Sequence, residues 1–208
     1  ITTYVTGKAV EKACEELKDR LCQVGAELLD CPREEVEYAR KAVRRLDGSA
    51  QVSLADIATK SMCGNGTAVQ ATCSHTSPIS PPPFMVGMAE VEVDRETGSV
   101  QVLDYTAVVD CGTPINPNLA RVQTEGGIVQ GIGMALFEDV TYTPEGRILE
   151  DSLMQYKLPT RLDMGHLQVE FESSYEQTGP FGAKSIGEIV INTPAPALAQ
   201  AIFRATGT

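Results

Sequence analysis

Four glycines lie inside a single predicted helix, and no other pattern in this sequence of 208 residues limits the fold as strongly. Asn116 and Pro117 are typical of the N-cap and first residue of a helix, which we expect to reach about Phe137. Its interior glycines are Gly126, Gly127, Gly131 and Gly133. Each costs about 1 kcal/mol relative to alanine, so we expect another group to approach this backbone closely. That group is either a tightly packed helix or a cofactor contacted by Gln123 and Gln130, two turns apart on one side.

The first third of the sequence predicts a long helix followed by shorter elements. Apolar residues spaced by three and four predict a helix from residue 8 to residue 29. They are Val10, Cys14, Leu17, Leu21, Val24 and Leu28. Residues 33–45 fit either a helix or two short strands around Arg40. The residues Ser53-Leu54-Ala55-Asp56 match a capping box, which opens a short helix to about Met62.

Strands and hairpins dominate the remainder. After the proline-rich run at residues 80–83, apolar and polar residues alternate over residues 88–94, and a turn leads into a return strand over residues 100–109. Further expected elements are a hairpin at residues 144–146, an extended segment over 155–159, a strand over 167–172 and a last helix from about Ala195. The sequence therefore predicts an α+β fold of mixed helices and antiparallel hairpins. We expect a helix-led subdomain of residues 1–65 and an α+β subdomain of residues 66–208 that carries the glycine-rich helix.

The composition excludes several classes of function. A net charge of -11 and an isoelectric point near 4.6 argue against nucleic acid or an anionic membrane as a partner, because both bind basic surfaces. The six cysteines show no CxxC spacing and the two histidines lie far apart, so no metal site made by protein side chains is expected. No apolar run approaches the ~20 residues that cross a bilayer. We expect a cytoplasmic protein with reduced thiols, and the first residue, Ile1, suggests a piece of a longer polypeptide.

A glycine-bracketed loop, residues 179–188, ends in the carboxylate of Glu188. Its glycines allow sharp turns and a close approach of the backbone to a ligand. The residues after Glu188 are apolar, so we expect its carboxylate in a place from which water is largely excluded, which suits a general base. The alternatives are a plain turn at Gly187 and a helix cap at Glu188.

The residues before the first helix, from Thr2 to Lys8, combine hydroxyl groups, a glycine and the free N–H groups of a helix N-terminus. This arrangement suits the binding of phosphate. The alternative is a simple N-cap formed by Thr6, and these residues by themselves favour the cap.

Together these segments resemble the C-terminal part of the molybdenum-binding subunit of the molybdenum hydroxylases, the family of xanthine dehydrogenase and aldehyde oxidoreductase. The resembling motifs occur in order over nearly the whole sequence, at residues 4–10, 90–94, 97–98, 110–112, 115–117, 123–133, 156–160 and 182–188. Such a series is far more specific than any of its members. The resemblance implies the fold of that molybdenum-binding domain, and it favours strands over residues 36–45.

The resemblance also implies roles for individual residues. Glu188 corresponds to the active-site glutamate that acts as the base when an N-heterocycle or an aldehyde is hydroxylated at an electron-poor carbon. Gly187 corresponds to a backbone contact near the metal, and Gln123 to a hydrogen-bond partner of the pterin. The other implied cofactor contacts are Thr3, Thr6, Gly7 and Lys8 at the pyrophosphate of a cytosine dinucleotide, and Lys184, Ser185 and Ile186 along the same cofactor. No protein side chain is implied as a ligand of the metal.

By the same resemblance, the cofactor is molybdopterin with molybdenum, in its cytosine dinucleotide form, and the upstream half of the subunit completes its pocket. Iron–sulfur clusters and FAD are expected on partner domains or subunits. The substrate is expected to be a small molecule, and the complete enzyme a homo-oligomer. The fragment alone is expected to be inactive.

Three residues depart from the family pattern: Ser185 replaces a glycine, while Ile189 and Gly165 each replace a proline. A hydroxyl at residue 185 adds either a clash or a new contact. The competing hypothesis is a non-catalytic assembly domain that keeps the fold without the cofactor.

Overall fold

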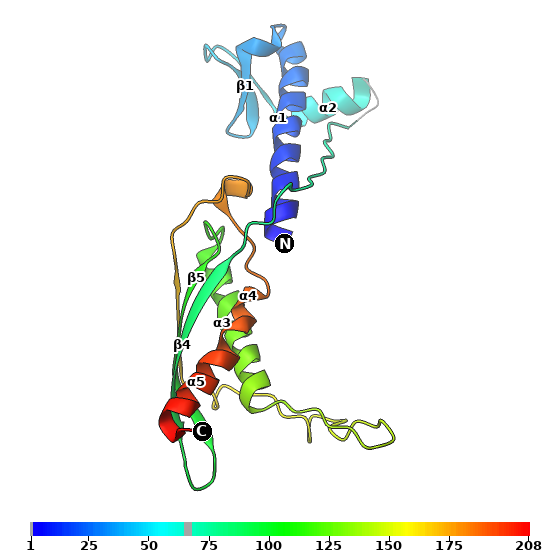
Figure 1. Ribbon diagram of the computed structural model, residues 1–208. Helices are drawn as coiled ribbons and strands as arrows, with labels where there is room; N and C mark the ends of the chain where they lie inside the picture. The colour runs from blue at the N-terminus through cyan, green and yellow to red at the C-terminus, as the bar shows by residue number, and fades with distance from the viewer. Residues whose placement is uncertain (1, 65–67) are drawn as a thin grey trace. The chain divides into compact units, whose positions relative to one another are not determined.

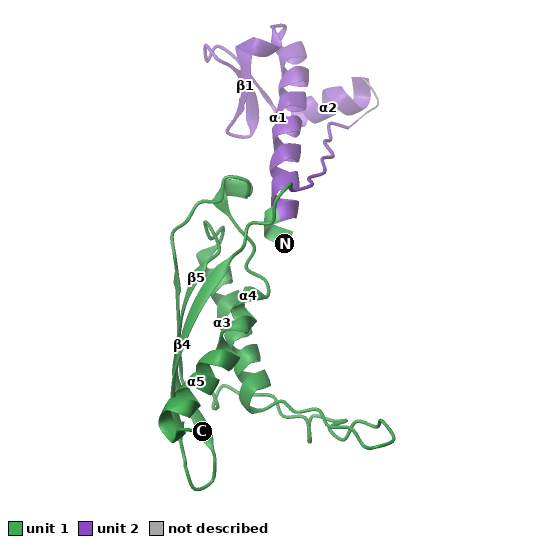
Figure 2. Cartoon of the chain, in the orientation of Figure 1, with its two compact units in different colours: residues 1–4, 78–208 green, residues 5–77 purple. Residues whose placement is uncertain are grey.

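The computed structural model describes residues 2–64 and 68–208, and the chain divides into two compact units (Figures 1 and 2). The smaller unit comprises residues 5–77, and the larger unit comprises residues 1–4 and 78–208. The predicted boundary between residues 65 and 66 lies outside the described residues and stays a prediction.

The smaller unit contains one long helix, a three-stranded antiparallel sheet and a short helix. The elements are α1 (Gly7–Leu29), η2 (Arg33–Glu35), β1 (Val36–Ala39), β2 (Ala42–Arg45), β3 (Gln51–Ser53) and α2 (Leu54–Gly64). Strand β2 pairs with both β1 and β3. Arg40 and Lys41 both have positive φ angles, which a tight two-residue hairpin turn requires. The strand interpretation of residues 36–45 is therefore confirmed.

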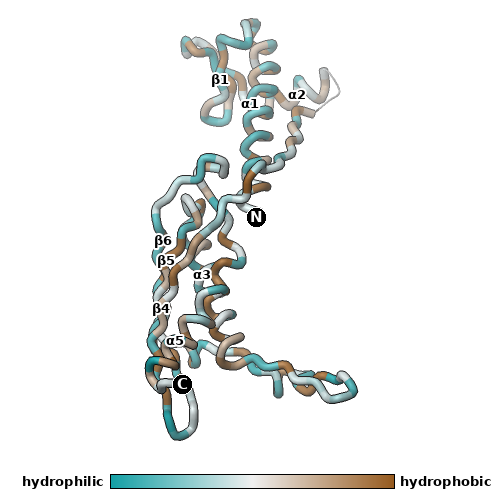
Figure 3. Tube along the Cα trace, in the orientation of Figure 1, coloured by the Kyte–Doolittle hydropathy of each residue, from teal (hydrophilic) through white to brown (hydrophobic). Residues whose placement is uncertain are grey.

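The core of the smaller unit lies against only the second half of α1. Cys22 and Ala26 are buried there, and Val43 of β2 packs so closely on Gly25 that a Cβ at this glycine would lie 2.5 Å from it. The predicted apolar stripe is wrong at its ends, because Val10 and Leu28 are exposed. Figure 3 shows how hydrophilic α1 is along most of its length.

The two helix starts of this unit differ from each other. The capping box before α2 is confirmed: Ser53 Oγ accepts a hydrogen bond from the backbone N–H of Asp56, whose carboxylate accepts one from the N–H of Ser53. The predicted cap at Thr6 is wrong, since its side chain makes no capping bond. The chain already has a helical path there, because a π-helical turn, η1 (Thr2–Thr6), leads into α1.

The larger unit is a three-stranded mixed sheet covered on one face by helices (Figure 1). Its elements are β4 (Phe84–Val93), β5 (Val100–Asp110), α3 (Pro117–Leu136), β6 (His166–Phe171), η3 (Pro180–Gly182), α4 (Ile189–Asn192) and α5 (Pro194–Thr206). The hairpin of β4 and β5 and the N-cap at Asn116, which accepts from the N–H of Leu119, are confirmed. The α+β class is confirmed as well. Strand β6, however, pairs parallel with β5, whereas only antiparallel hairpins were predicted.

The core of this unit lies between the sheet and the helices. The inward side chains of β5, among them Tyr105 and Val109, are fully buried against Ile128 and Ile132 of α3 and Leu198 of α5. Tyr105 also donates a hydrogen bond from its hydroxyl to Thr193 Oγ1, just before α5.

The glycines of α3 are explained mainly by helix packing. A Cβ at Gly127 would lie 2.1 Å from Val190 of α4, and one at Gly131 would lie 2.7 Å from Pro194 of α5. A Cβ at Gly133 would meet the carboxylate of Glu138 at 2.5 Å. Only at the remaining glycine of the four, residue 126, is there open space, with no atom within 4 Å. Close packing therefore accounts for three of the four positions.

Residues 138–165 form a long excursion from the end of α3 to β6 (Figure 1). The predicted hairpin at residues 144–146 is reduced to a turn closed by one bridge between Tyr142 and Ile148. The predicted extension is wrong at its start, because Gln155 lies in a turn held by Ser152. Within the described ranges, no helix is both long and apolar enough to span a membrane.

The neighbouring glycines of α3 provide a matched test of this packing. Gly127→Ala should lower the free energy of unfolding by about 1–3 kcal/mol, because its methyl group overlaps Val190. Gly126→Ala should leave it unchanged or raise it by up to about 1 kcal/mol, because alanine favours the helix and the space is open. Urea unfolding followed by circular dichroism measures both. Equal effects of the two substitutions would contradict the packing explanation.

Candidate functional site

A hollow of about 450 Å³ lies in the larger unit, between the start of α3 and the glycine-bracketed loop. It is lined by Thr2, Thr3, Cys111, Thr113, Pro114, Ile115, Asn116, Leu119, Ala120, Gln123, Ala183, Lys184, Ile186 and Gly187. Five residues predicted from the sequence therefore come together here: Thr3, Gln123, Lys184, Ile186 and Gly187. They come from three segments that are far apart in the chain.

One hydrogen bond joins α3 directly to the loop. The side-chain amide of Gln123 donates from Nε2 to the backbone carbonyl of Gly187 at 3.3 Å. A second hollow, of about 310 Å³, adjoins these two residues and is also lined by Gly126 and Gln130. The loop and α3 thus line two adjoining hollows. At Gly126 and at Gly187 an added Cβ would have no atom of another group within 4 Å, so both positions are open.

The turn after β5 holds the loop through backbone contacts. The N–H of Lys184 donates to the carbonyl of Cys111, and the N–H of Thr113 donates to the carbonyl of Gly182, both at 2.8 Å. Gly112, with a φ of +68°, lies so close that a Cβ there would be 2.3 Å from that carbonyl oxygen. Only glycine fits this approach. Backbone contacts therefore join two of the segments that line the hollow.

Asp110, the last residue of β5, makes the principal charged contact of this region. Its Oδ2 pairs with Lys184 Nζ at 2.6 Å, and its Oδ1 accepts from Ser174 Oγ at 2.5 Å and from the N–H of Gly112 at 3.0 Å. The side chains of Asp110 and Lys184 are only 19% and 11% exposed. Burial raises the pKa of Asp110, but the bonds from Lys184, Ser174 and Gly112 and the lysine's charge outweigh it and lower the pKa overall.

Two loop residues that line the hollow, Ile186 and Gly187, carry backbone N–H donors. Within the part of the chain that the structure describes, no other protein group accepts from the backbone N–H of Ile186 or Gly187. Adjacent N–H groups of this kind, beside positions without a Cβ, suit a large and partly anionic group such as a pterin with its phosphate. The residues present therefore fit the cofactor that the sequence resemblance implies.

Glu188 follows the loop directly and precedes α4. The prediction that it lies where water is scarce is wrong for this chain, because Glu188 is exposed. The apolar residues after it cover α3 instead, as the contact of Val190 with Gly127 shows. The alternative of a helix cap is also wrong, since the Glu188 side chain makes no capping bond to α4.

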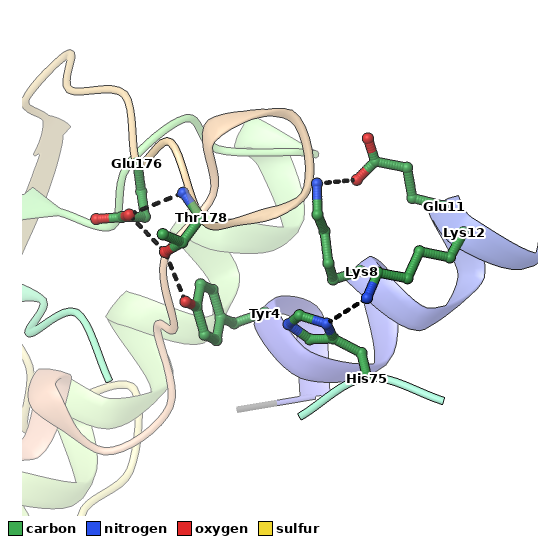
Figure 4. A network of polar contacts seen from close by, with 7 residues as sticks. All are labelled: Tyr4, Lys8, Glu11, Lys12, His75, Glu176 and Thr178. Carbon is green, nitrogen blue, oxygen red and sulfur yellow. Dashed lines mark hydrogen bonds and ion pairs between the residues drawn. The ribbon is translucent and has the colours of Figure 1, made fainter. Parts of the chain in front are cut away.

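The segment that carries Thr2 and Thr3 is fixed by a buried tyrosine. The hydroxyl of Tyr4 lies 2.6 Å from Thr178 Oγ1, and Thr178 in turn donates to the carboxylate of Glu176, as Figure 4 shows. Tyr4 is only 4% exposed. Neither this anchor nor a role for Asp110 was predicted from the sequence, although residues 110–112 belong to one of the motifs that carry the resemblance.

The remaining predicted residues are not among those that line the hollow. Ser185 is half-buried and is not among the lining residues. Thr6, Gly7 and Lys8 belong to the smaller unit, where Lys8 pairs with Glu11 at 2.8 Å (Figure 4). Their assignment to the cofactor stays a prediction.

The lowered pKa of Asp110 predicts a pH dependence of stability. A depressed pKa contributes stability that is present above the unfolded value, near 3.9, and is lost as the pH falls through the folded value. Asp110→Asn should therefore lower the free energy of unfolding by roughly 2–4 kcal/mol at pH 7, with the difference shrinking as the pH falls below about 4.

Urea unfolding at a series of pH values measures this difference. Asp19→Asn, which breaks an exposed pair with Arg33, is the control and should follow the wild type at each pH. An Asp110→Asn variant as stable as the wild type at pH 7 would contradict the prediction.

Comparisons with known proteins identify the family of this chain. The family model described as "Molybdopterin cofactor-binding domain" matches residues 1–165. "Probable hypoxanthine oxidase XdhD" of Escherichia coli K12 is 36% identical over 99% of this chain and 22% of its own length. "6-hydroxypseudooxynicotine dehydrogenase complex subunit gamma" of Paenarthrobacter nicotinovorans is 28% identical over 97% of this chain and 26% of its own.

A crystal structure gives the same result for the fold. Quinoline 2-oxidoreductase from Pseudomonas putida 86 matches with a TM-score of 0.84 and 25% identity, over 99% of this chain and 27% of that one. This chain thus spans about a quarter of the length of the relatives that it matches. The resemblance seen in the sequence is confirmed: the chain belongs to the molybdenum hydroxylase family, as part of its molybdopterin cofactor-binding domain.

Proposed function

We propose that this chain binds molybdopterin and supplies the catalytic base of a molybdenum hydroxylase. The observation that carries the proposal is the hollow in which Gln123 of α3, Thr3 and three loop residues meet, with Glu188 next in the chain. The loop residues are Lys184, Ile186 and Gly187. A site built from segments so far apart in sequence, in a fold of this family, is the default location of a ligand.

The cofactor is held mainly by backbone and amide groups. The N–H groups of Ile186 and Gly187 would donate to it, the side chain of Gln123 would contact the pterin, and the open space at Gly126 would leave room for it beside α3. When bound, the molybdenum cofactor supplies the two-electron redox chemistry of the reaction, which amino-acid side chains do not provide.

The cytosine dinucleotide form of the cofactor is the more specific part of the proposal. Thr3 lines the hollow, and Thr6, Gly7 and Lys8 follow it closely in sequence at the start of α1. Neither η1 nor the first turn of α1 contains an acidic residue, so no carboxylate of these turns repels a pyrophosphate at the positive end of this helical segment.

Glu188 acts on the proton of the oxygen nucleophile. Its carboxylate would accept that proton as the oxygen bonds to an electron-poor carbon of an N-heterocycle or an aldehyde, while the C–H bond at that carbon breaks and its electron pair is taken up by the two-electron redox chemistry of the cofactor. The Gln123 bond to Gly187 and the packing of Val190 on Gly127 hold the backbone on both sides of Glu188. Because solvent reaches Glu188 in this chain, we expect turnover only where further polypeptide and substrate cover the site.

The substrate class and partners follow from the relatives' names. One relative is named for hypoxanthine and a structural relative for quinoline, both N-heterocycles, and another is named as a subunit of a complex. We therefore propose a small N-heterocycle or aldehyde as substrate. The rest of the molybdenum subunit, iron–sulfur and flavin domains or subunits, a homo-oligomeric complete enzyme and a cytoplasmic location complete the proposal.

A non-catalytic assembly domain is the second candidate. It would need neither the base nor the donors of the loop. Gln123, Ile186 and Gly187 line one hollow, Glu188 follows directly in the chain, and the N–H groups of Ile186 and Gly187 have no acceptor among the described residues; together these features favour the enzyme. Molybdenum content of the purified complete protein distinguishes the two, since an assembly domain without cofactor would carry none.

Replacement of the base is the direct test. In the complete enzyme, Glu188→Gln should retain molybdenum and pterin but lower kcat by about 10²–10⁴-fold, because the amide cannot accept the proton. Glu170→Gln, on the exposed edge of β6, is the matched control and should turn over normally. Activity is measured on a panel of N-heterocycles and aldehydes, with molybdenum measured by elemental analysis. Turnover near the wild-type rate in Glu188→Gln would remove this residue from the base role.

The dinucleotide assignment has its own test. Gly7→Asp should lower the content of molybdenum and of cytidine monophosphate released by acid, because a carboxylate at the start of α1 repels a pyrophosphate. Gly7→Asn has nearly the same shape without the charge and should retain more of both. If the two variants carry equal amounts of cofactor, charge at the start of α1 does not matter and the assignment fails.

A further inference from the structure

We propose that Asp110 is a positioning residue, and that its ion pair with Lys184 fixes the loop that carries Gly187 and Glu188. In this arrangement the charge of Lys184 stabilises the loop and does not bind the cofactor. This inference rests on the proposed function for the meaning of the loop. It gives a role to Asp110, to which the family resemblance assigns none, and it replaces the cofactor contact that the resemblance implies for Lys184.

The geometry makes Asp110 the point at which three segments meet. Its carboxylate receives Lys184 Nζ from the loop, Ser174 Oγ from the segment after β6 and the N–H of Gly112 from the turn after β5. The carboxylate itself comes from the last residue of a central strand, so its own position is set by pairing with Phe84 of β4 and by the buried Val109 beside it. A rigid strand thereby positions a loop that has no regular structure over residues 184–186.

The side chain of Lys184 contacts two partners, the carboxylate of Asp110 and the ring of Phe84. Its ammonium group lies 2.6 Å from Asp110 Oδ2 and 5.4 Å from the centre of the Phe84 ring. At 11% exposure, the side chain has little freedom to leave this arrangement. Attraction to an aromatic ring adds to the ion pair when the cation is partly desolvated.

The pair also decides the charge of the hollow. Lys184 lines the hollow, but the carboxylate of Asp110 neutralises its charge. An anionic group in the hollow therefore finds backbone N–H donors at Ile186 and Gly187 and no net positive side chain from this pair. If the lysine served the cofactor by charge, a partner carboxylate at 2.6 Å would oppose that function.

A double-mutant cycle separates these two roles. The variants are Asp110→Asn, Lys184→Met and the combination of both in the complete protein. The first leaves a partly buried ammonium group without its counter-ion, the second leaves a partly buried carboxylate without its counter-ion, and the combination leaves neither charge. The readouts are amide hydrogen exchange over residues 182–187, molybdenum content and kcat.

We expect each single variant to exchange at least tenfold faster over residues 182–187, with at least threefold less molybdenum and a lower kcat. The double variant should recover exchange and molybdenum content to within about threefold of the wild type. If Lys184 holds the cofactor by charge, the double variant will contain as little molybdenum as Lys184→Met, and Asp110→Asn will keep its molybdenum. That result, or additive effects on exchange, would overturn the proposal.

Two further variants serve as a milder substitution at the same contact and as a distant control. Ser174→Ala removes one bond to the carboxylate without leaving a charge unpaired, so it should fold and show a smaller increase in exchange over the same residues. If amide hydrogen exchange over residues 182–187 in this variant equals that of the wild type, the result contradicts the proposal that Asp110 positions the loop. Glu37→Gln, which breaks an exposed ion pair with Arg44 in the smaller unit, should change none of the readouts.

This experiment can fail or succeed independently of the proposed function. Hydrogen exchange on protein without cofactor reports the loop directly and needs no turnover. If Glu188→Gln proves fully active, the base assignment fails, while the exchange data still decide whether Asp110 and Lys184 hold the loop.

Discussion

The structure depends on close contact between the backbone of α3 and the segment that contains α4 and α5. At Gly127 and Gly131 the helix has no Cβ, which lets Val190 and Pro194 approach to distances that any side chain would prevent. Because Gly187 lies only three residues before Val190, the same contact brings the loop against α3. There the side chain of Gln123 donates a hydrogen bond to the carbonyl of Gly187. Packing of the core and placement of the candidate site are thus a single arrangement.

Local patterns in the sequence predicted the elements whose causes are local. The capping box at Ser53 and the N-cap at Asn116 depend on residues three positions away, and the hairpin of β4 and β5 depends on one turn. The parallel pairing of β6 with β5 was not predictable in this way, because it depends on the path of α3 and of the long excursion after it. The unburied ends of the α1 stripe have the same origin, since periodicity does not show which part of a helix its neighbours cover.

The candidate site shows a similar division. Its segments were recognisable from the sequence, because glycines and a carboxylate in a fixed order carry a strong resemblance. Its internal contacts were not. The apolar residues after Glu188 indicated a dry carboxylate, whereas in the fold Val190 is buried on Gly127 and Glu188 faces solvent. A one-dimensional pattern gives the hydrophobicity of a neighbour in sequence, while burial is decided by neighbours in space.

Charge connects the composition to the site. A chain with a net charge of -11 has little long-range attraction for an anionic cofactor, and the lysine that lines the hollow is neutralised by Asp110. What remains for recognition is short-range: the N–H groups of Ile186 and Gly187, the amide of Gln123 and the space left by missing Cβ atoms. Such donors are useful only while the backbone keeps its position, so a site of this kind requires rigid support for its loop. The concentration of close backbone contacts around residues 110–113 and 182–184 meets that requirement.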